Sequence, residues 1–466
     1  MTGIDSVSGI DSVSGMASVT GMDNVLPYPD QALFLALRGA DQEAVMQALW
    51  VYDHPIDLAG VKRFSDYFGR GLMARGIETS PLPFGRHRWV SSTSVRAGFD
   101  VAEHPRDRAE LYDWADEQIA LPLDPERGPG WRLAGQALTD GGFVVSLVVS
   151  HCIADGVAAF IAATAAINGT TRDISYPPPG SRSRGRRVLA DLRQIIRDAP
   201  EIARTLRKAV RVGIARRRDL TRPAPTPLPA AAGNRIALVP SASIFIDIAM
   251  WDALADKLGG NSFSLVSGFA GRLAEHLKRT RKSDGVVTLM IPVSEREGLD
   301  DTGGNMVSIA SVSFDPGGVT TDLTGVRTAI RNGLKTARDV PDEMVELLPL
   351  IPFVPKRGIA RMADVAFGFS IDLPVSVSNF GDLPAELNRI DGTAAERFSF
   401  RGVDRNVTHE TLERRGGILT VTSGRIDGKL SITVISYQPG IQNSQSGLRQ
   451  VIAQTLADFG LTGEIV

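Results

Sequence analysis

Residues 141–156 read Gly141-Gly-Phe-Val-Val-Ser-Leu-Val-Val-Ser-His151-Cys-Ile-Ala-Asp155-Gly156. The glycine-led, valine-rich run predicts a strand buried on both faces, which is typical of α/β proteins. The alanine-rich run from Asp155 to Asn168 predicts a helix that is closed by Asn-Gly. His151 is therefore expected at a strand-to-helix turn, where α/β proteins often place reactive groups.

The same turn carries the pattern H-x-x-x-D-G, formed by His151, Asp155 and Gly156. A neutral histidine at a strand end can accept a proton near pH 7. Asp155 can fix the turn by pairing with an arginine, and Gly156 permits a tight entry into the helix. The alternative is a buried histidine bonded to the backbone, with Asp155 as an ordinary helix N-cap. Spacing alone leaves both interpretations open.

The length of 466 residues suits two domains. Residues 1–25 repeat a small polar unit, GIDSVS, and predict a disordered extension. Residues 26–222 and 241–466 alternate predicted strands and helices, and the proline-rich segment 223–240 is the predicted linker between them. Within that segment, 235–240 (RIALVP) predicts a short strand.

The charge of the chain is segregated. Lys and Arg number 51 against 53 Asp and Glu, which argues against a nucleic-acid protein defined by overall basicity. Residues 181–222, however, hold 14 Lys and Arg against 4 Asp and Glu, a net charge of +10, so the rest of the chain carries −12. Apolar residues recur in this segment at helical intervals, and Pro200 is expected to interrupt or restart the helix.

Three interpretations of segment 181–222 stay open. It can be a solvated helical face, as most charge runs are. It can be a basic amphipathic helix that touches anionic lipid. It can also dock the phosphates of CoA or an acidic carrier protein.

The chain has one cysteine, Cys152, which excludes an intramolecular disulfide. Adjacent strand residues face opposite sides, so Cys152 is expected to be a buried thiol and not a nucleophile beside His151. The six histidines lack metal-ligand spacing, and we expect no metal. Neither a signal peptide nor a membrane-spanning run is evident, which predicts a cytoplasmic protein that meets a membrane only at its surface.

Several segments occur in an order that resembles the superfamily of wax ester synthases and diacylglycerol acyltransferases (WS/DGAT). This superfamily also includes polyketide-associated acyltransferases, nonribosomal peptide synthetase condensation domains and chloramphenicol acetyltransferase. The resemblance spans roughly residues 26–460, and the matching segments follow the order of the wax ester synthase branch. The matching segments are Pro129-Gly-Trp131, Ser150-His151-Cys-Ile-Ala-Asp155-Gly156, the helix from Asn261-Ser262, Ile291-Pro-Val-Ser294-Glu-Arg296, Gly304-Asn305 and Val377-Ser378-Asn379.

The resemblance implies an α/β fold of two chloramphenicol-acetyltransferase-like domains, with mixed β-sheets flanked by helices and a tunnel at their interface. His151 would act as the general base, and no cofactor is needed beyond the acyl-CoA or acyl-carrier thioester that serves as substrate. Asp155 would be structural, paired with one of Arg86, Arg88 and Arg296. Candidates for oxyanion stabilisation or substrate binding are backbone N–H groups near Gly156 and the side chains of Ser378, Asn379, Trp131, Asn261 and Asn305.

Two positions depart from the family pattern. The family usually has two consecutive histidines, and the first is Ser150 here. Because successive strand residues face opposite sides, this loss should cost little chemically, although it leaves the subfamily open. The family's Asn-Asp pair is Asn261-Ser262.

The function expected from the resemblance is transfer of a fatty acyl group from acyl-CoA to a hydroxyl acceptor, such as a long-chain alcohol or diacylglycerol. The alternatives are a carrier-protein-dependent enzyme that forms an ester or amide, and a non-catalytic relative that binds acyl-CoA or lipid. The expected location is the cytoplasm, with contact to a membrane or lipid droplet through segment 181–222.

Overall fold

The computed structural model describes residues 24–40, 42–92, 98–171, 174, 176–216, 235–339, 345–354 and 373–466. Most of the predicted extension 1–25, most of the predicted linker 223–240 and the end of the basic segment, 217–222, lie outside these residues.

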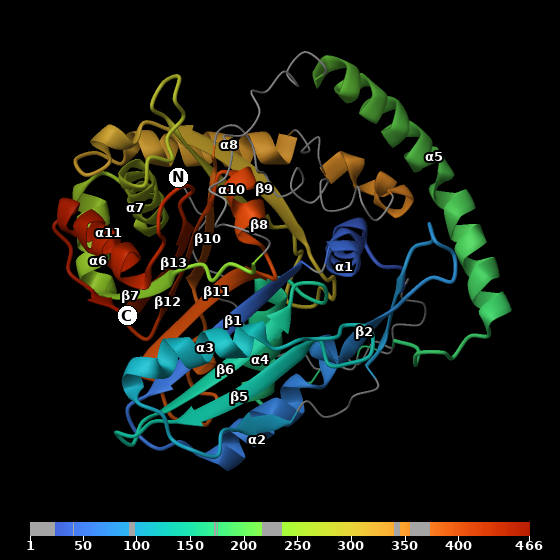
Figure 1. Ribbon diagram of the computed structural model, residues 1–466, viewed down its shortest axis with the longest axis horizontal. Helices are drawn as coiled ribbons and strands as arrows, with labels where there is room; N and C mark the ends of the chain where they lie inside the picture. Colours follow the sequence, from blue (N-terminus) through green and yellow to red (C-terminus); the bar gives the residue numbers. More distant parts are fainter. Residues whose placement is uncertain are drawn as a thin grey trace.

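The helices and strands alternate along the chain (Figure 1). The first half contains α1 (Tyr28–Ala40), β1 (Glu43–Tyr52), α2 (Leu58–Phe68), η1 (Gly71–Ala74), β2 (Arg75–Glu78), β3 (Arg88–Ser91), β4 (Phe99–Val101), η2 (Arg108–Glu110), α3 (Leu111–Ala120), β5 (Trp131–Ala137), β6 (Phe143–Ser150), α4 (Gly156–Ile167) and α5 (Arg184–Arg216). The second half contains β7 (Ser241–Asp247), α6 (Ile248–Lys257), α7 (Ser262–His276), β8 (Val287–Ser294), β9 (Val307–Phe314), η3 (Pro316–Gly318), α8 (Thr324–Asp339), η4 (Val345–Phe353), β10 (Val375–Asp382), η5 (Ala385–Asn388), β11 (Arg397–Arg405), α10 (His409–Arg415), β12 (Ile418–Ile426), β13 (Lys429–Tyr437), α11 (Gln445–Asp458) and β14 (Glu464–Ile465).

The first sheet has the order β11-β1-β6-β5-β4, with β6 at its centre. All eight residues of β6 are buried, because α4 and α2 pack on one face of the sheet and α3 contacts the strands from the other. The valine-rich run thus forms the doubly buried strand that its composition predicts. The sheet is mixed, since β4 runs parallel to β5 and its other pairs are antiparallel.

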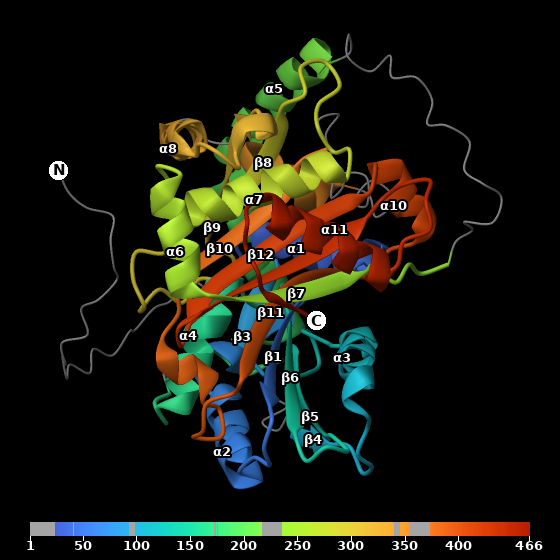
Figure 2. The ribbon, with the colours of Figure 1, turned by 90° about the vertical axis from the view of Figure 1, so that its left-hand side faces the viewer.

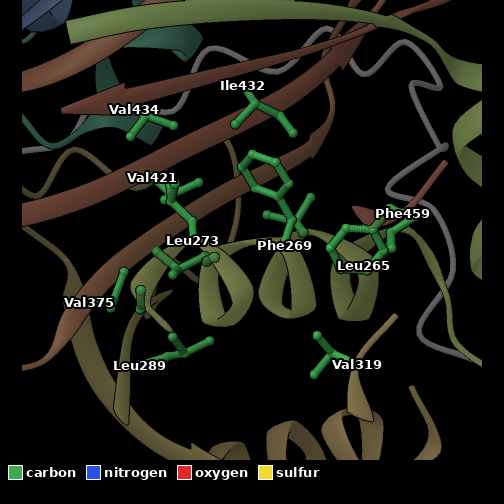
Figure 3. Packing of buried hydrophobic residues seen from close by; sticks show 14 of the residues in the cluster. Leu265, Phe269, Leu273, Leu289, Val319, Val375, Val421, Ile432, Val434 and Phe459 are labelled. Carbon is green, nitrogen blue, oxygen red and sulfur yellow. The ribbon is translucent and has the colours of Figure 1, made fainter. Parts of the chain in front are cut away.

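The second sheet has seven strands in the order β14-β7-β13-β12-β10-β8-β9 and is also mixed, because β10 runs parallel to both β12 and β8. Helix α7 packs against it through Leu265, Phe269 and Leu273, which meet Val421 and Ile432 in the core (Figure 3). The two mixed sheets flanked by helices confirm the predicted fold class.

One strand crosses between the halves. β11 belongs to the second half by sequence, yet it pairs antiparallel with β1 of the first sheet, from Glu43 opposite Arg405 to Val51 opposite Arg397. Figure 2 shows β11 beside β1, below the second sheet. The predicted boundary at 223–240 is therefore not a complete division of the two sheets.

Two local predictions were wrong. Helix α5 runs without a break through Pro200. Pro200 is exposed, so the carbonyl that loses its partner at the proline can be hydrated. Residues 235–240 do not form the predicted strand, because a single isolated bridge, between Ile236 and Thr408, is the only β-pairing described for them. Within the described residues, no helix combines the length and the apolar character needed to cross a bilayer.

Candidate active site

His151 follows β6 directly, and the turn after it leads into α4. Its backbone N–H donates to Ala44 O on the neighbouring strand β1 (2.9 Å), which fixes the start of the turn. Asp155 is the N-cap of α4, and its Oδ1 accepts from Ala158 N (2.8 Å). The N-cap role that the sequence offered as an alternative is therefore present.

The same carboxylate also pairs with an arginine from the second half. Arg296 Nη2 lies 2.8 Å from Asp155 Oδ2, and both side chains are 3% exposed. Of the three predicted arginine partners, only Arg296 meets Asp155. Arg86 pairs with Asp198 and Arg88 with Asp191, both on α5.

The connection between β8 and β9, residues 295–306, thus reaches across to the His151 turn. Gly304 O accepts from Asp155 N (3.2 Å), and Met306 N donates to Asp155 Oδ2 (3.0 Å). Asp155 is consequently bonded on both carboxylate oxygens, by its own helix and by the opposite half. Asp155 therefore links the His151 turn to the second half of the chain.

Asn305, on this connection, contacts the imidazole. Its Nδ2 donates to Asp30 Oδ1 (2.6 Å) and to His151 O (2.8 Å), and both of these atoms can only accept. Its Oδ1 therefore faces His151 Nδ1, at 2.7 Å, and accepts a hydrogen bond from the Nδ1–H group. With the proton on Nδ1, Nε2 of the neutral imidazole keeps the lone pair and can accept another proton.

Asp30 is the end of this chain of contacts, and the sequence analysis did not single it out. Its carboxylate accepts from Asn305 N (2.9 Å) as well as from Asn305 Nδ2, while Oδ2 is buried without a partner among the described residues. Burial raises the pKa of Asp30 to about 6, against the lowering by Asn305 and Arg75. An Asp in the first turn of a helix is an ordinary pattern, so no local signal marks it.

Arg75 was also missed. Its fully buried guanidinium donates to Ile153 O (2.7 Å) in the turn and to Thr302 O (2.6 Å) and Gly303 O (3.1 Å) in the β8–β9 connection. It also stacks 4.6 Å from the ring of Trp89. Arg75 therefore joins the same two segments as the Asp155–Arg296 pair.

Ser150 and Cys152 face away from this set of contacts. Ser150 Oγ donates to Glu43 Oε1 (2.6 Å), and Glu43 is ion-paired with Arg405 of β11. Cys152 is buried, and burial raises the pKa of its thiol, which disfavours the thiolate that a nucleophile needs. Ser150, which replaces the first of the two histidines in the pattern that the sequence resembles, therefore links β6 to β1.

Gly156 meets the second half through Phe380. A Cβ at Gly156 would lie 2.6 Å from Phe380 Cζ, so close packing, and not an unusual φ, accounts for the glycine. Ser378 and Asn379 precede Phe380 on β10, and Asn379 Oδ1 accepts from Ser423 Oγ (2.9 Å). These two predicted residues thus lie on the strand that touches the start of α4.

Two other predicted residues have structural surroundings. Trp131 is buried at the start of β5, with its ring 4.9 Å from Phe68 in an edge-on contact. Asn261 is the N-cap of α7 and forms a reciprocal capping box with Ser264. Neither has a contact with His151 among those described.

A cavity of about 190 Å³ lies between α2, η1 and α4, lined partly by Tyr67, Leu72, Ile161 and Ala165. His151 is not among its lining residues, so the predicted tunnel remains a prediction. In the part of the chain that the structure describes, no three His, Cys, Asp or Glu residues are grouped to hold a metal.

Comparison with known proteins gives structural matches only. No protein-family model and no curated protein sequence matches the chain. It is similar to the first condensation domain of the CDA synthetase, at 14% identity and a TM-score of 0.56, covering 95% of this chain and 99% of that one. It is also similar to polyketide synthase associated protein 5 from Mycobacterium tuberculosis, at 16% identity and a TM-score of 0.54, covering 93% of this chain and 97% of that one.

A wax ester synthase/diacylglycerol acyltransferase from Marinobacter aquaeolei VT8 matches at 16% identity and a TM-score of 0.52, covering 94% of this chain and all of that one. At these identities the matches bear on the fold. The chain therefore has the same double-domain α/β fold as these condensation-domain and acyltransferase structures.

Proposed function

We propose that the protein is an acyltransferase that moves an acyl group from a thioester to a hydroxyl acceptor, with His151 as the general base. The observation that carries this proposal is the contact between Asn305 Oδ1 and His151 Nδ1, which assigns the free lone pair to Nε2. A histidine held in that tautomer between two halves is suited to proton transfer.

The proposed reaction begins when Nε2 takes the proton of the acceptor hydroxyl. The hydroxyl oxygen then attacks the thioester carbonyl carbon, and the resulting oxyanion is stabilised by N–H groups near Gly156 or by Ser378 and Asn379. The C–S bond breaks, and the imidazolium returns its proton to the departing thiolate. The products are an ester and a free thiol, which balance the two substrates.

We propose acyl-CoA and a lipid alcohol or diacylglycerol as the substrates, and a cytoplasmic site of action with contact to an anionic surface. The resemblance to the wax ester synthase fold supports this choice, whereas the equally similar condensation domain supports a carrier-bound thioester and an ester or amide product. The donor therefore has to be decided by assay.

The test is thiol release by the purified full chain from a series of acyl-CoAs and acylated carrier proteins, each with a panel of alcohols and amines. We expect one donor class to give acceptor-dependent release, and His151→Ala to lower it by about 10² to 10⁴. His104→Ala, at an exposed histidine, is the matched control and should leave the rate unchanged. Equal acceptor-dependent rates for wild type and His151→Ala would refute the role of His151 as general base. No release with any donor would leave the non-catalytic alternative.

A further inference from the structure

Helix α5 buries polar side chains against the protein and leaves a row of large apolar side chains exposed. A surface helix normally packs its apolar stripe on the core. In α5 the buried residues are polar, namely Asp191, Gln194, Asp198 and Thr205. The helix lies along the outer edge of the molecule (Figure 1).

Hydrogen bonds and ion pairs hold the inner side of α5. Asp191 accepts from Ser80 Oγ (2.6 Å) and pairs with Arg88 (3.4 Å). Asp198 pairs with Arg86 (3.5 Å) and accepts from Gln194 Nε2 (2.8 Å). The half-buried Val188, Ile195 and Ile202 lie on the same inner side. These three side chains and the pairs with Arg88 and Arg86 attach the helix to the rest of the protein without the apolar residues of its outer side.

The other apolar residues of α5 form an exposed stripe. They recur at alternating spacings of three and four, so they share one side of the helix. Ile196 is 73% exposed, and the other large members are about half exposed. The stripe consists of Leu189, Leu192, Ile196, Ala199, Ala203, Leu206 and Val210. An exposed apolar surface of this length marks an interaction site.

A row of arginines runs beside the apolar stripe. The row consists of Arg186, Arg193, Arg197, Arg204 and Arg211, which are exposed and fall near one line of the helix. Within the described residues, none of these five forms an ion pair. Of the acidic residues between positions 184 and 211, Asp191 and Asp198 are buried and Glu201 is exposed. The outward side of α5 is therefore apolar and strongly cationic together.

We infer that this side of α5 binds the surface of an anionic lipid bilayer. A 33-residue helix extends roughly 50 Å, long enough to lie along a membrane surface. Its leucine, isoleucine and valine side chains enter the head-group boundary while the arginines meet lipid phosphates. A second copy of the chain fits less well, since a symmetric contact would bring two arginine rows together. The inference does not depend on the acyl-transfer proposal.

The test is flotation of the full chain with vesicles of phosphatidylcholine alone or mixed with phosphatidylglycerol, at low and high salt. We expect binding to the mixed vesicles only, weakened by salt. Each arginine near an anionic surface contributes about fivefold in partition, so Arg193, Arg197, Arg204 and Arg211→Gln together should weaken binding on the order of 100-fold or more. Leu192→Asn with Ile196→Asn should weaken it about tenfold.

Matched controls separate the helix from general surface effects. Arg327→Gln with Arg331→Gln removes two exposed arginines from α8, and Leu299→Asn removes an exposed apolar side chain elsewhere. Both should bind as wild type does, and circular dichroism checks that every variant is folded. Absence of flotation, equal binding to both vesicle types, or equal binding by wild type and α5 variants would overturn the inference. So would a dimer that is lost in the Ile196 variant without any vesicle binding.

Discussion

Replacement of Asn305 by alanine removes the only acceptor described for His151 Nδ1. The general base contributes about 10² to 10⁴ in rate, and this sets a ceiling on the effect because Asn305 acts through the imidazole. For metal-bound histidines, loss of the partner that orients the ring typically costs 10- to 100-fold, and we take the same range here. We therefore expect kcat to fall by about 10- to 100-fold, or roughly 1.4 to 2.7 kcal/mol in barrier height, with a smaller change in KM.

The fold should also lose stability. The alanine variant lacks the bonds from Asn305 Nδ2 to Asp30 and to His151 O, and the bond with Nδ1. At about 1 kcal/mol for each net hydrogen bond, and more for the carboxylate, the free energy of unfolding should drop by about 3 to 4 kcal/mol. Asn388→Ala is the matched control, because buried Asn388 likewise donates to a backbone carbonyl and a carboxylate, of Ala395 and Asp427. It should lose stability and keep kcat.

The assay is thiol release under saturating donor, in a double-mutant cycle with His151→Ala. If Asn305 positions the imidazole, the Asn305→Ala effect disappears once His151 is alanine. If Asn305 instead binds substrate or the oxyanion, the roles for which the resemblance made it a candidate, its effect persists in the His151→Ala background. Additive losses, or a kcat within twofold of wild type in the single variant, would refute the positioning role.

Three further variants test the contacts around the turn. Arg296→Met leaves Asp155 as an unpaired buried charge and should lower the free energy of unfolding by about 3 to 5 kcal/mol in urea melts. The control Arg106→Met, at the exposed pair with Glu117, should lower it by less than about 1 kcal/mol. Equal losses would contradict the role of Asp155 as a link between the halves. Gly156→Ala should cost about 1 to 3 kcal/mol by displacing Phe380, while Gly325→Ala, in the first turn of α8 with open space around it, should cost nothing in the same melts. Burial raises the pKa of Asp30 from its ordinary 3.8 to about 6, so the folded state holds this proton more tightly than the unfolded state. Stability should therefore be lost as pH rises from about 4 through 6, by up to about 3 kcal/mol relative to Asp30→Asn. Parallel pH profiles of the two proteins would contradict the raised pKa.

The local part of the site could be predicted from the sequence. The valine run, the alanine-rich helix and Asp155 are adjacent in the chain, and their patterns depend on short-range geometry that propensity and periodicity capture. The arginine partner of Asp155 could be narrowed to three candidates, because a buried carboxylate needs a cation but the pattern does not say which one is near.

The long-range part could not be predicted from pattern. Asp30 and Asn305 are 275 positions apart, and their contact depends on how α1 and the β8–β9 connection meet in three dimensions. Arg75 similarly bonds to carbonyls 78 and 227 positions away. Nothing in the residues beside either side chain differs from an ordinary helix start or a short strand. The exposure of the apolar stripe of α5 could not be predicted for the same reason, since a periodic pattern shows a stripe but not which way it faces.

The contacts of His151 also restrict how the two halves can move. Strand β11 is bonded along β1, and the β8–β9 connection holds Asp155, His151 and Arg75 at once. Full separation of the halves would break a nine-residue ladder and take away the group that keeps the Nδ1 proton in place. Under the proposed function, we therefore expect substrates to reach His151 while both sets of contacts persist. Variants that loosen the interface, such as Arg296→Met, should accordingly lose turnover together with stability.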